Sequence, residues 1–382
     1  MSRRIAIFTH STNPRGGVVH AMQLAEALCD QGEDATLVAP ALPGARFFCE
    51  PRCPSLLIPA APAGSTVDMV ERRIGEIERA MLDQPFDIHH AQDPISANAL
   101  ANLREAGAIP GFMRTVHHLD DFADPRLAAW QARGWQTAGM LLTVSLLWQE
   151  KLTTLARRAV QQISNGVDHQ RFSPLWTERD TETAKALGLP QAPFFLSLGG
   201  IEERKNTLGV LRAFLQLHAT RPDVSLVIAG GASLLNHGVP QDAFAAELRR
   251  ATPEAQRAVQ ILGVIDDSAM PTLYRAAHAL VAPSFMEGFG LCPLEAMSCG
   301  TPAIVSEIRP FTDHLREDEA FWADPADPSS IAHAMALSLG DAGYLRLSRA
   351  GPAAAARFSW DRVARDHRAF YTAFAEETLA HA

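Results

Sequence analysis

The chain has 382 residues, which is too long for one ordinary hydrophobic core and, at ~100–200 residues per domain, predicts two domains. Apolar residues make up 47% and charged residues 20% of a chain whose net charge is −9, a composition typical of a well-packed protein that has no nucleic-acid partner. The apolar stretches are too short to span a bilayer or to form a signal peptide, and five scattered cysteines suit a reducing compartment, so we expect a cytoplasmic protein.

Short apolar runs alternate with amphipathic stretches through the first part of the chain. The pattern predicts strands at 5–9, 35–39, 113–116 and 140–145, with a helix over about 18–31 after the first strand. Alternation of this kind is typical of a parallel α/β sheet, whose strands are buried on both faces.

A polar, proline-containing link at 168–180 interrupts the alternation, which then restarts. Strands are predicted at 194–199, 224–230, 259–264, 279–283 and 303–306. A helix over 207–220 has an apolar stripe that should face its own sheet, formed by Leu208, Leu211, Phe214, Leu215 and His218. The sequence therefore predicts two doubly wound α/β domains, residues 1–167 and 168–359.

The last segment, 360–382, is predicted to be a helix with no strand after it. One of its faces is largely aromatic and is formed by Val363, His367, Phe370, Tyr371 and Phe374. Such a face must be covered by another part of the protein.

The segment 281–301 reads VAPSFMEGFGLCPLEAMSCGT and indicates a ligand pocket. It predicts an apolar strand, a loop with Glu287 between the strand and two glycines, and a helix that carries Glu295. Glycines let the backbone approach a ligand, and the start of the helix presents N–H groups and a positive dipole end to phosphate. The two carboxylates can accept hydrogen bonds from sugar and ribose hydroxyls, so the layout favours a nucleotide-sugar site.

Glu287 and Glu295, followed by CGTPAIVS, resemble the motif of the family-4 retaining glycosyltransferases of GT-B architecture. Pro14–Arg15–Gly16–Gly17, Thr115–Val116–His117, Asn165–Gly166–Val167–Asp168 and the Lys205 segment occur in the order of that family. The resemblance spans nearly the whole chain. It implies an N-terminal acceptor domain, 1–167, and a C-terminal donor domain, 168–359, facing a cleft, with the helix 360–382 crossing back to the first domain.

Arg204 and Lys205 follow the predicted strand 194–199 by five to six residues, which places them at the carboxyl end of a strand, where α/β sheets bind ligands. The resemblance implies that Lys205 contacts the donor phosphate. The family arginine that usually stands five residues earlier is replaced by Gly200, and Arg204 is the candidate that would supply the missing charge. A solvated charged turn is the alternative for this segment.

The resemblance also implies roles for other residues. His117 would hydrogen-bond the donor sugar close to Glu287, Gly16 and Gly17 would close over the diphosphate, and Val264 would lie by the base. Backbone N–H groups would come from the donor loop, formed by Gly288, Phe289, Gly290 and Leu291. Because the glycines at 16–17 lack the G-x-G-x-x-G pattern, a dinucleotide cofactor is disfavoured. We expect no cofactor and no metal, although Asp120 and Asp121 form an acidic pair.

These features predict a metal-independent, retaining glycosyltransferase that moves a sugar from a nucleotide-diphosphate sugar to a small-molecule, lipid or glycan acceptor. A nucleotide-sugar epimerase of the same fold is one alternative, and a non-catalytic nucleotide-sugar binder, favoured by Gly200, is another. The helix around 69–82, with Arg72, Arg73 and Arg79, suggests peripheral contact with an anionic membrane surface. The sequence leaves the base, the sugar, the acceptor and the oligomeric state open.

Overall fold

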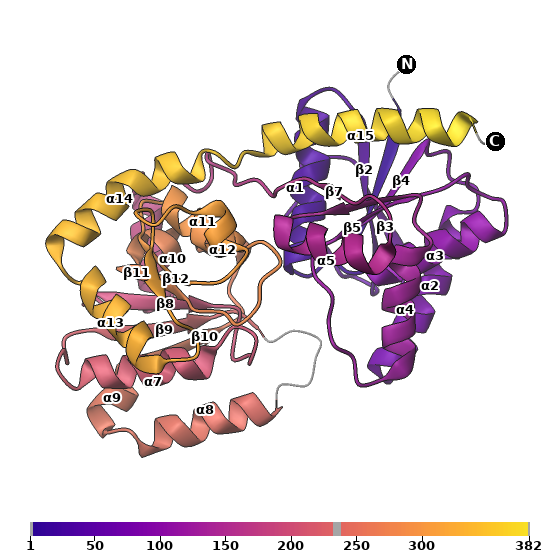
Figure 1. Cartoon of the computed structure of the whole chain (residues 1–382). Coiled ribbons are helices and arrows are strands. Elements are labelled where there is room, and N and C mark those ends of the chain that lie inside the picture. The colour runs from indigo at the N-terminus through magenta and orange to yellow at the C-terminus, as the bar shows by residue number, and fades with distance from the viewer. Residues whose placement is uncertain (1–2, 232–237, 381–382) are drawn as a thin grey trace. The chain divides into compact units, whose positions relative to one another are not determined.

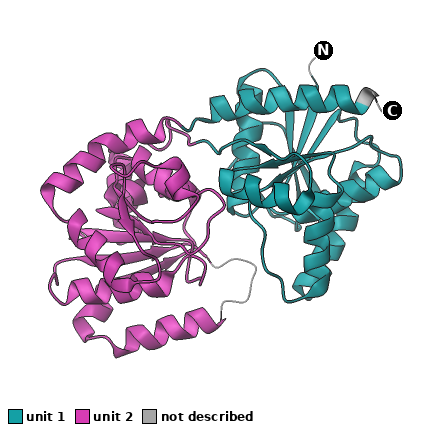
Figure 2. Cartoon of the chain, viewed as in Figure 1, with its two compact units in different colours: residues 1–166, 358–382 teal, residues 167–357 magenta. Residues whose placement is uncertain are grey.

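The computed structural model describes residues 3–231 and 238–380. The chain divides into two compact units (Figure 2), of which the first comprises 1–166 with 358–382 and the second comprises 167–357. The boundaries expected from the sequence, after residues 167 and 359, lie one and two residues beyond the observed ones. Each unit has its own sheet and its own hydrophobic core.

The first unit is built on a seven-stranded parallel sheet with the strand order β3-β2-β1-β4-β5-β6-β7 (Figure 1). Its elements are β1 (Arg4–Phe8), α1 (Gly16–Asp30), β2 (Asp34–Ala41), β3 (Ser55–Pro59), α2 (Thr66–Met81), β4 (Ile88–Ala91), α3 (Pro94–Glu105), β5 (Met113–Val116), α4 (Pro125–Gln136), β6 (Met140–Thr143), α5 (Leu146–Ala156), β7 (Gln161–Gln162) and α15 (Trp360–Ala380). The strand order changes direction between β1 and β4, and such a switch point opens a crevice at the carboxyl ends of the strands.

The second unit repeats this plan with six parallel strands in the order β10-β9-β8-β11-β12-β13. Its elements are α6 (Glu178–Ala186), β8 (Phe194–Leu198), α7 (Thr207–His218), β9 (Ser225–Ala229), α8 (Gly238–Arg250), α9 (Pro253–Arg257), β10 (Val259–Gly263), the 3-10 helix η1 (Asp267–Ala269), α10 (Met270–Ala276), β11 (Ala279–Ala282), α11 (Leu291–Ser298), β12 (Ala303–Ser306), α12 (Phe311–His314), β13 (Phe321–Ala323), α13 (Pro328–Ser338) and α14 (Asp341–Ala355). Here the switch point lies between β8 and β11.

The buried face of α7 differs in part from the predicted stripe. Leu211, Phe214 and His218 are buried as expected, but Leu208 and Leu215 are only partly buried. The face is completed by three other side chains, those of Val210, Ala213 and Leu217. The buried face of the helix is therefore rotated relative to the predicted face. The apolar stripe is wide, so the sequence alone does not specify which part of it is most deeply buried, and packing against neighbouring elements decides this.

Helix α15 packs within the first unit and lies beside α1 (Figure 1). Its residues Trp360, Val363, Ala364, Tyr371 and Phe374 belong to the same core cluster as residues of β1 and α1. The aromatic face expected from the sequence is thus covered by the first sheet and by α1, with Phe370 only partly buried. The helix completes a core that the N-terminal segment alone would leave exposed.

Candidate functional site

The best-defined charged site of the second unit lies at the carboxyl ends of β8 and β11. These strands are neighbours in the sheet, so the loops that follow them meet although they are far apart in sequence. Asn206 joins the two loops, because its side-chain amide donates a hydrogen bond to the carbonyl of Pro283 at 3.0 Å. The same amide donates to the carbonyl of Pro325, in the loop after β13, at 2.7 Å. Gly199 and Gly200 both adopt positive φ angles, which lets the chain turn sharply after β8.

Lys205, Arg204 and Glu287 form an ion cluster at this place. Lys205 Nζ lies 2.7 Å from Glu287 Oε1, which also accepts a hydrogen bond from the Ser284 hydroxyl at 2.8 Å. Arg204 Nη1 lies 3.4 Å from the other carboxylate oxygen, Oε2. Glu287 is only 7% exposed, and its burial by itself would raise its pKa, but the charges of Lys205 and Arg204 lower the pKa to about 2. The carboxylate is therefore ionised at neutral pH.

The loop after Glu287 leads directly into α11. Gly290 precedes the helix with a φ of 92°, and an added Cβ there would overlap the ring of Phe311, so only glycine fits. Leu291 is the first residue of the helix, whose first-turn N–H groups have no partner within the helix. A cavity of about 20 Å³, enough for one water molecule, lies between this turn and the ion cluster and is lined by Lys205, Ser284 and Glu287 among others.

Phe289 anchors the loop through its buried side chain. Its ring packs against that of His314 with a centroid distance of 4.3 Å, and its carbonyl oxygen lies 3.0 Å from His314 Nε2. Burial lowers the pKa of His314 to about 4, so the imidazole is neutral and donates its Nε2 hydrogen to that carbonyl. Phe289 thus positions the backbone of Gly288 and Gly290 on either side of it.

Glu295 and Val264, two further predicted donor residues, do not line the small cavity. Glu295, in the second turn of α11, accepts a hydrogen bond from the hydroxyl of Tyr274 at 2.6 Å on Oε2, and burial raises its pKa. In the described residues no donor lies on its other oxygen, Oε1. Val264 directly follows β10, at the edge of the sheet, and is 72% exposed.

The first unit brings another group of predicted residues together. His117, directly after β5, places Nε2 3.1 Å from the side-chain oxygen of Gln92, which directly follows β4. Gly17, in the first turn of α1, lies against the same ring, since an added Cβ would lie 3.5 Å from His117 Cδ2. Gly16 begins the helix. These residues share the carboxyl ends of β1, β4 and β5.

His20 and Asn165 support His117 and were not predicted as site residues. The rings of His20 and His117 meet edge to face at 4.8 Å, and His20 Nδ1 lies 2.8 Å from the side-chain oxygen of Asn165. Burial lowers the pKa of His117 well below its usual range, and nearby His20 lowers it further. Asn165 belongs to a motif noted in the sequence, whereas no local pattern marks His20 or Gln92, because only the packing of α1 and β4 brings them to His117.

The acidic pair after β5 does not extend into a larger cluster. Asp120 Oδ1 lies 3.3 Å from His118 Nε2. Across residues 3–231 and 238–380, no group of three or more His, Cys, Asp and Glu side chains is arranged to hold a metal ion. In the same part of the chain, none of the helices is both long enough and apolar enough to cross a membrane.

The fold defines the class of protein. Two parallel α/β units with loop sites at their strand carboxyl ends are the GT-B arrangement of glycosyltransferases. The sucrose-phosphate synthase of Thermosynechococcus elongatus superimposes with a TM-score of 0.78 over 100% of both chains, at 19% identity. Anabaena Alr3699/HepE, solved with UDP and glucose, superimposes with a TM-score of 0.78 over 97% of this chain and 100% of its own, at 16% identity.

Sequence comparison specifies the family. The model described as glycosyl transferases group 1 matches residues 179–354, and the model described as glycosyltransferase family 4 matches residues 14–171. The chain therefore belongs to the family-4, or group 1, glycosyltransferases, which confirms the resemblance seen in its motifs.

Several curated relatives are mannosyltransferases. The phosphatidyl-myo-inositol mannosyltransferase of Mycobacterium tuberculosis is 28% identical over 385 residues, which cover 94% of this chain and 93% of the relative. The lipopolysaccharide core biosynthesis mannosyltransferase LpsB of Rhizobium meliloti is 36% identical over 152 residues, 40% of this chain and 41% of its own. The O-antigen chain mannosyltransferase B of Escherichia coli is 36% identical over 170 residues, 44% and 42% of the two chains. The last two matches span less than half the length of each relative.

Proposed function

We propose that the protein is a retaining, metal-independent glycosyltransferase that moves a sugar from a nucleotide-diphosphate sugar to a small-molecule, lipid or glycan acceptor. The observation that carries this proposal is the cluster of Lys205, Arg204 and Glu287 beside the first turn of α11. In the proposal the second unit binds the donor and the first unit binds the acceptor.

The donor diphosphate would lie against the backbone N–H groups around Gly290 and Leu291, where the dipole of α11 favours negative charge. Lys205 and Arg204 would stabilise the charge that grows on the leaving diphosphate. Lys205 and Arg204 both form ion pairs with Glu287 in this structure, so their N–H groups would be shared between Glu287 and a bound diphosphate. Gly200, at a φ of 75°, could not be replaced by arginine without strain, and Arg204 would supply the second positive charge in its place.

Glu287 would hold the sugar rather than transfer a proton. Because its pKa is about 2, it has no proton to give at neutral pH and acts as an acceptor for sugar hydroxyls. Glu295 would accept a ribose hydroxyl on Oε1 while Tyr274 stays on Oε2. Val264, exposed after β10, would lie against the base.

His117 would contribute an acceptor atom to the donor sugar. Its Nε2 faces the side-chain amide oxygen of Gln92 and so carries the hydrogen, which leaves Nδ1 with a free electron pair in the neutral ring. The loop at Gly16 and Gly17 would close over the diphosphate. No side chain is assigned as a covalent nucleophile, and the leaving phosphate would accept the proton of the acceptor hydroxyl on the same face, so that the anomeric configuration is kept.

The names of the relatives indicate which donor to test first. The three relatives described above are all mannosyltransferases, so we propose a mannosyl donor. Since Anabaena HepE was solved with UDP-glucose, UDP-glucose is the second donor to test.

The test is a donor panel with matched variants. GDP-mannose, UDP-glucose and ADP-glucose are each added to the purified protein, and binding is measured as a rise in the unfolding temperature. Transfer of labelled sugar to a cell extract is then measured with and without EDTA, and NMR identifies the anomer formed. We expect Lys205→Ala and Glu287→Ala each to lower the transfer rate by about 10²- to 10³-fold, whereas Lys185→Ala, on the surface of α6, leaves it unchanged.

Each outcome separates the proposal from its alternatives. Donor epimerisation without any acceptor would identify an epimerase. Donor binding with no transfer to any extract, in the wild type, would identify a binding protein. If Lys205→Ala binds and transfers as well as the wild type, the phosphate assignment is wrong, and loss of activity in EDTA would refute metal independence.

A further inference from the structure

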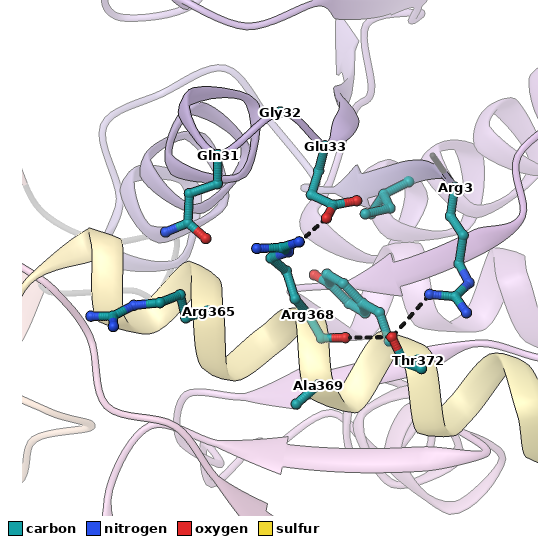
Figure 3. Close-up of a pocket in the computed structure, with 10 residues that line it drawn as sticks. Arg3, Gln31, Gly32, Glu33, Arg365, Arg368, Ala369 and Thr372 are labelled. Carbon is teal, nitrogen blue, oxygen red and sulfur yellow. Dashed lines mark hydrogen bonds and ion pairs between the residues drawn. The ribbon is translucent and has the colours of Figure 1, made fainter. Parts of the chain in front are cut away.

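A cavity of about 460 Å³ lies in the first unit, apart from the residues assigned above (Figure 3). Its wall is formed by the start of β1, the turn between α1 and β2, and one face of α15. The lining residues are Arg3, Ile5, Gln31, Gly32, Glu33, Arg365, Arg368, Ala369, Tyr371 and Thr372. This place is at the amino end of β1, whereas Gly17 and His117 lie at the carboxyl ends of the strands. The cavity therefore belongs to a different end of the sheet from the candidate active site.

The wall of the cavity carries an excess of positive charge. Arg3 Nη1 donates to the hydroxyl of Thr372 at 2.9 Å, and no carboxylate of the described chain lies within ion-pair distance of Arg3. Arg368 Nε lies 2.6 Å from Glu33, and Arg365 Nη2 lies 3.0 Å from Asp361 outside the lining. Three guanidinium groups thus face two carboxylates, which leaves one positive charge in a protein whose net charge is −9.

Donors of these arginines remain available for a ligand. Arg368 uses only Nε toward Glu33, and Arg3 uses only Nη1 toward Thr372, so each keeps further N–H groups (Figure 3). Guanidinium groups form paired hydrogen bonds with the oxygens of phosphate, and a volume of about 460 Å³ falls within the range of small-molecule sites.

Gln31 has a side-chain oxygen that lacks a hydrogen-bond donor. Its side-chain nitrogen donates to the backbone oxygen of Asp361 at 2.7 Å and to Oδ1 of the same residue at 2.9 Å. Both partners are acceptors, which fixes the orientation of the amide. Its oxygen, Oε1, is buried and has no hydrogen-bond partner in the described chain. The protein covers this oxygen, so a hydroxyl of a ligand in the cavity would satisfy it once the Gln31 side chain turns toward the ligand.

We propose that this cavity binds a phosphomonoester that carries hydroxyl groups, a compound of the sugar-phosphate class. Its phosphate would lie between Arg3 and Arg368 with Arg365 at the rim, and one of its hydroxyls would donate to Gln31. Because Arg3 precedes β1 and the other two arginines belong to α15, the ligand links that helix to the sheet. Binding therefore stabilises the first unit.

The experiment measures the unfolding temperature at constant ionic strength with glucose 6-phosphate, inorganic phosphate or potassium chloride. At a tenfold excess over its dissociation constant, glucose 6-phosphate should raise the midpoint by about 3 °C. The double variant Arg3→Gln/Arg365→Gln should weaken binding at least tenfold, measured by calorimetry. Arg368 is kept, since its removal would leave Glu33 unpaired. The control Arg362→Gln removes an equally exposed arginine that pairs with Asp366 on the same helix.

Further variants locate the phosphate and the hydroxyl. Gln31→Met should weaken glucose 6-phosphate more than inorganic phosphate. Lys205→Ala should leave the response intact, because the diphosphate site of the second unit is separate, and loss of the response in this variant would overturn the proposal. The proposal would also be overturned if the double variant and the control responded equally to glucose 6-phosphate, or if the wild type did not respond.

A lipid headgroup is a second type of ligand that would present a phosphate group to these arginines. Vesicles of phosphatidylcholine with phosphatidic acid are therefore sedimented with the wild type and the double variant. Arginine-dependent sedimentation together with a glucose 6-phosphate response supports the site and shows that it also accepts a lipid phosphate. Arginine-dependent sedimentation without any response to the soluble compounds overturns the sugar-phosphate assignment.

Discussion

Acidification should unfold the first unit before the second, because the first unit holds four buried histidines and a partly buried fifth, His117, that are neutral in the folded state. Burial lowers the pKa of His20 to about 3 and those of His89 and His367 to about 4. It lowers the pKa values of His90 and His117 well below their ordinary value of 6.5. An imidazole that is protonated only when the chain unfolds makes stability depend on pH.

The sign and the size of this pH dependence follow from the number of protons that the folded and unfolded chains bind. Below pH 6.5 the unfolded chain takes up protons that the folded unit excludes, so the free energy of unfolding falls as the pH falls toward the folded pKa values. Each such histidine contributes a slope of ~1.4 kcal/mol per pH unit, and the three near pH 3–4 together contribute ~4 kcal/mol per unit between about pH 6 and pH 5. Against a typical stability of ~5–15 kcal/mol this is a large loss. The second unit has lowered pKa values at His278 and His314 and should show a smaller slope.

The assay is urea unfolding at pH 7, 6 and 5, with hydrogen exchange measured by mass spectrometry so that the two units are followed separately. His89→Phe is the diagnostic variant, because His89 Nε2 is buried without a hydrogen-bond partner and its ring already stacks on Phe8 at 6.2 Å. We expect this variant to reduce the slope of the first unit by ~1.4 kcal/mol per pH unit. Equal slopes in the two units, or an unchanged slope in the variant, would refute the reasoning.

Two further predictions concern the second unit. Gly290→Ala should lower its free energy of unfolding by roughly 3 kcal/mol, since the residue has a φ of 92° and the new methyl group would strike Phe311. The control Gly263→Ala, in the same unit, also has a positive φ but its methyl group meets no atom within 4 Å, so equal urea midpoints for the two variants would contradict the prediction. Tyr274→Phe should lower the free energy of unfolding by about 2 kcal/mol in the same assay, because it removes the buried hydroxyl that donates to Glu295. The pKa of Glu295, followed by carboxyl NMR, should rise further, and an unchanged pKa would show that the hydrogen bond does not form.

Much of the fold follows from local sequence patterns. The apolar runs at 113–116, 194–199 and 303–306 correspond closely to β5, β8 and β12, because a buried parallel strand requires a short continuous apolar segment. The loop from Glu287 to Leu291 was also predictable, since Gly290 adopts a backbone conformation that other residues rarely adopt. Four strands, β3, β4, β7 and β13, were not among the predicted strands. Of these, β7 and β13 have only two and three residues, and such short segments carry little periodicity.

The site illustrates what local patterns cannot specify. Lys205 and Glu287 were predicted separately, but nothing near either residue in the chain indicates that their charges lie 2.7 Å apart. Their contact arises because β8 pairs with β11. In the first unit, Gln92 and His20 contact His117 only through the packing of β4 and α1. The exposure of Val264 follows from the position of β10 at the sheet edge.

The sequence by itself determined the class of fold, the family and the residue types of the loop from Gly288 to Leu291, because periodicity, glycine positions and motif order are properties of neighbouring residues. Only the tertiary structure decided which strands are neighbours, that Glu287 is buried and ionised between two cations, and that α15 forms one wall of an arginine-lined cavity. These features depend on contacts between residues far apart in the chain, whose free energy is set by burial and by the distance between charges.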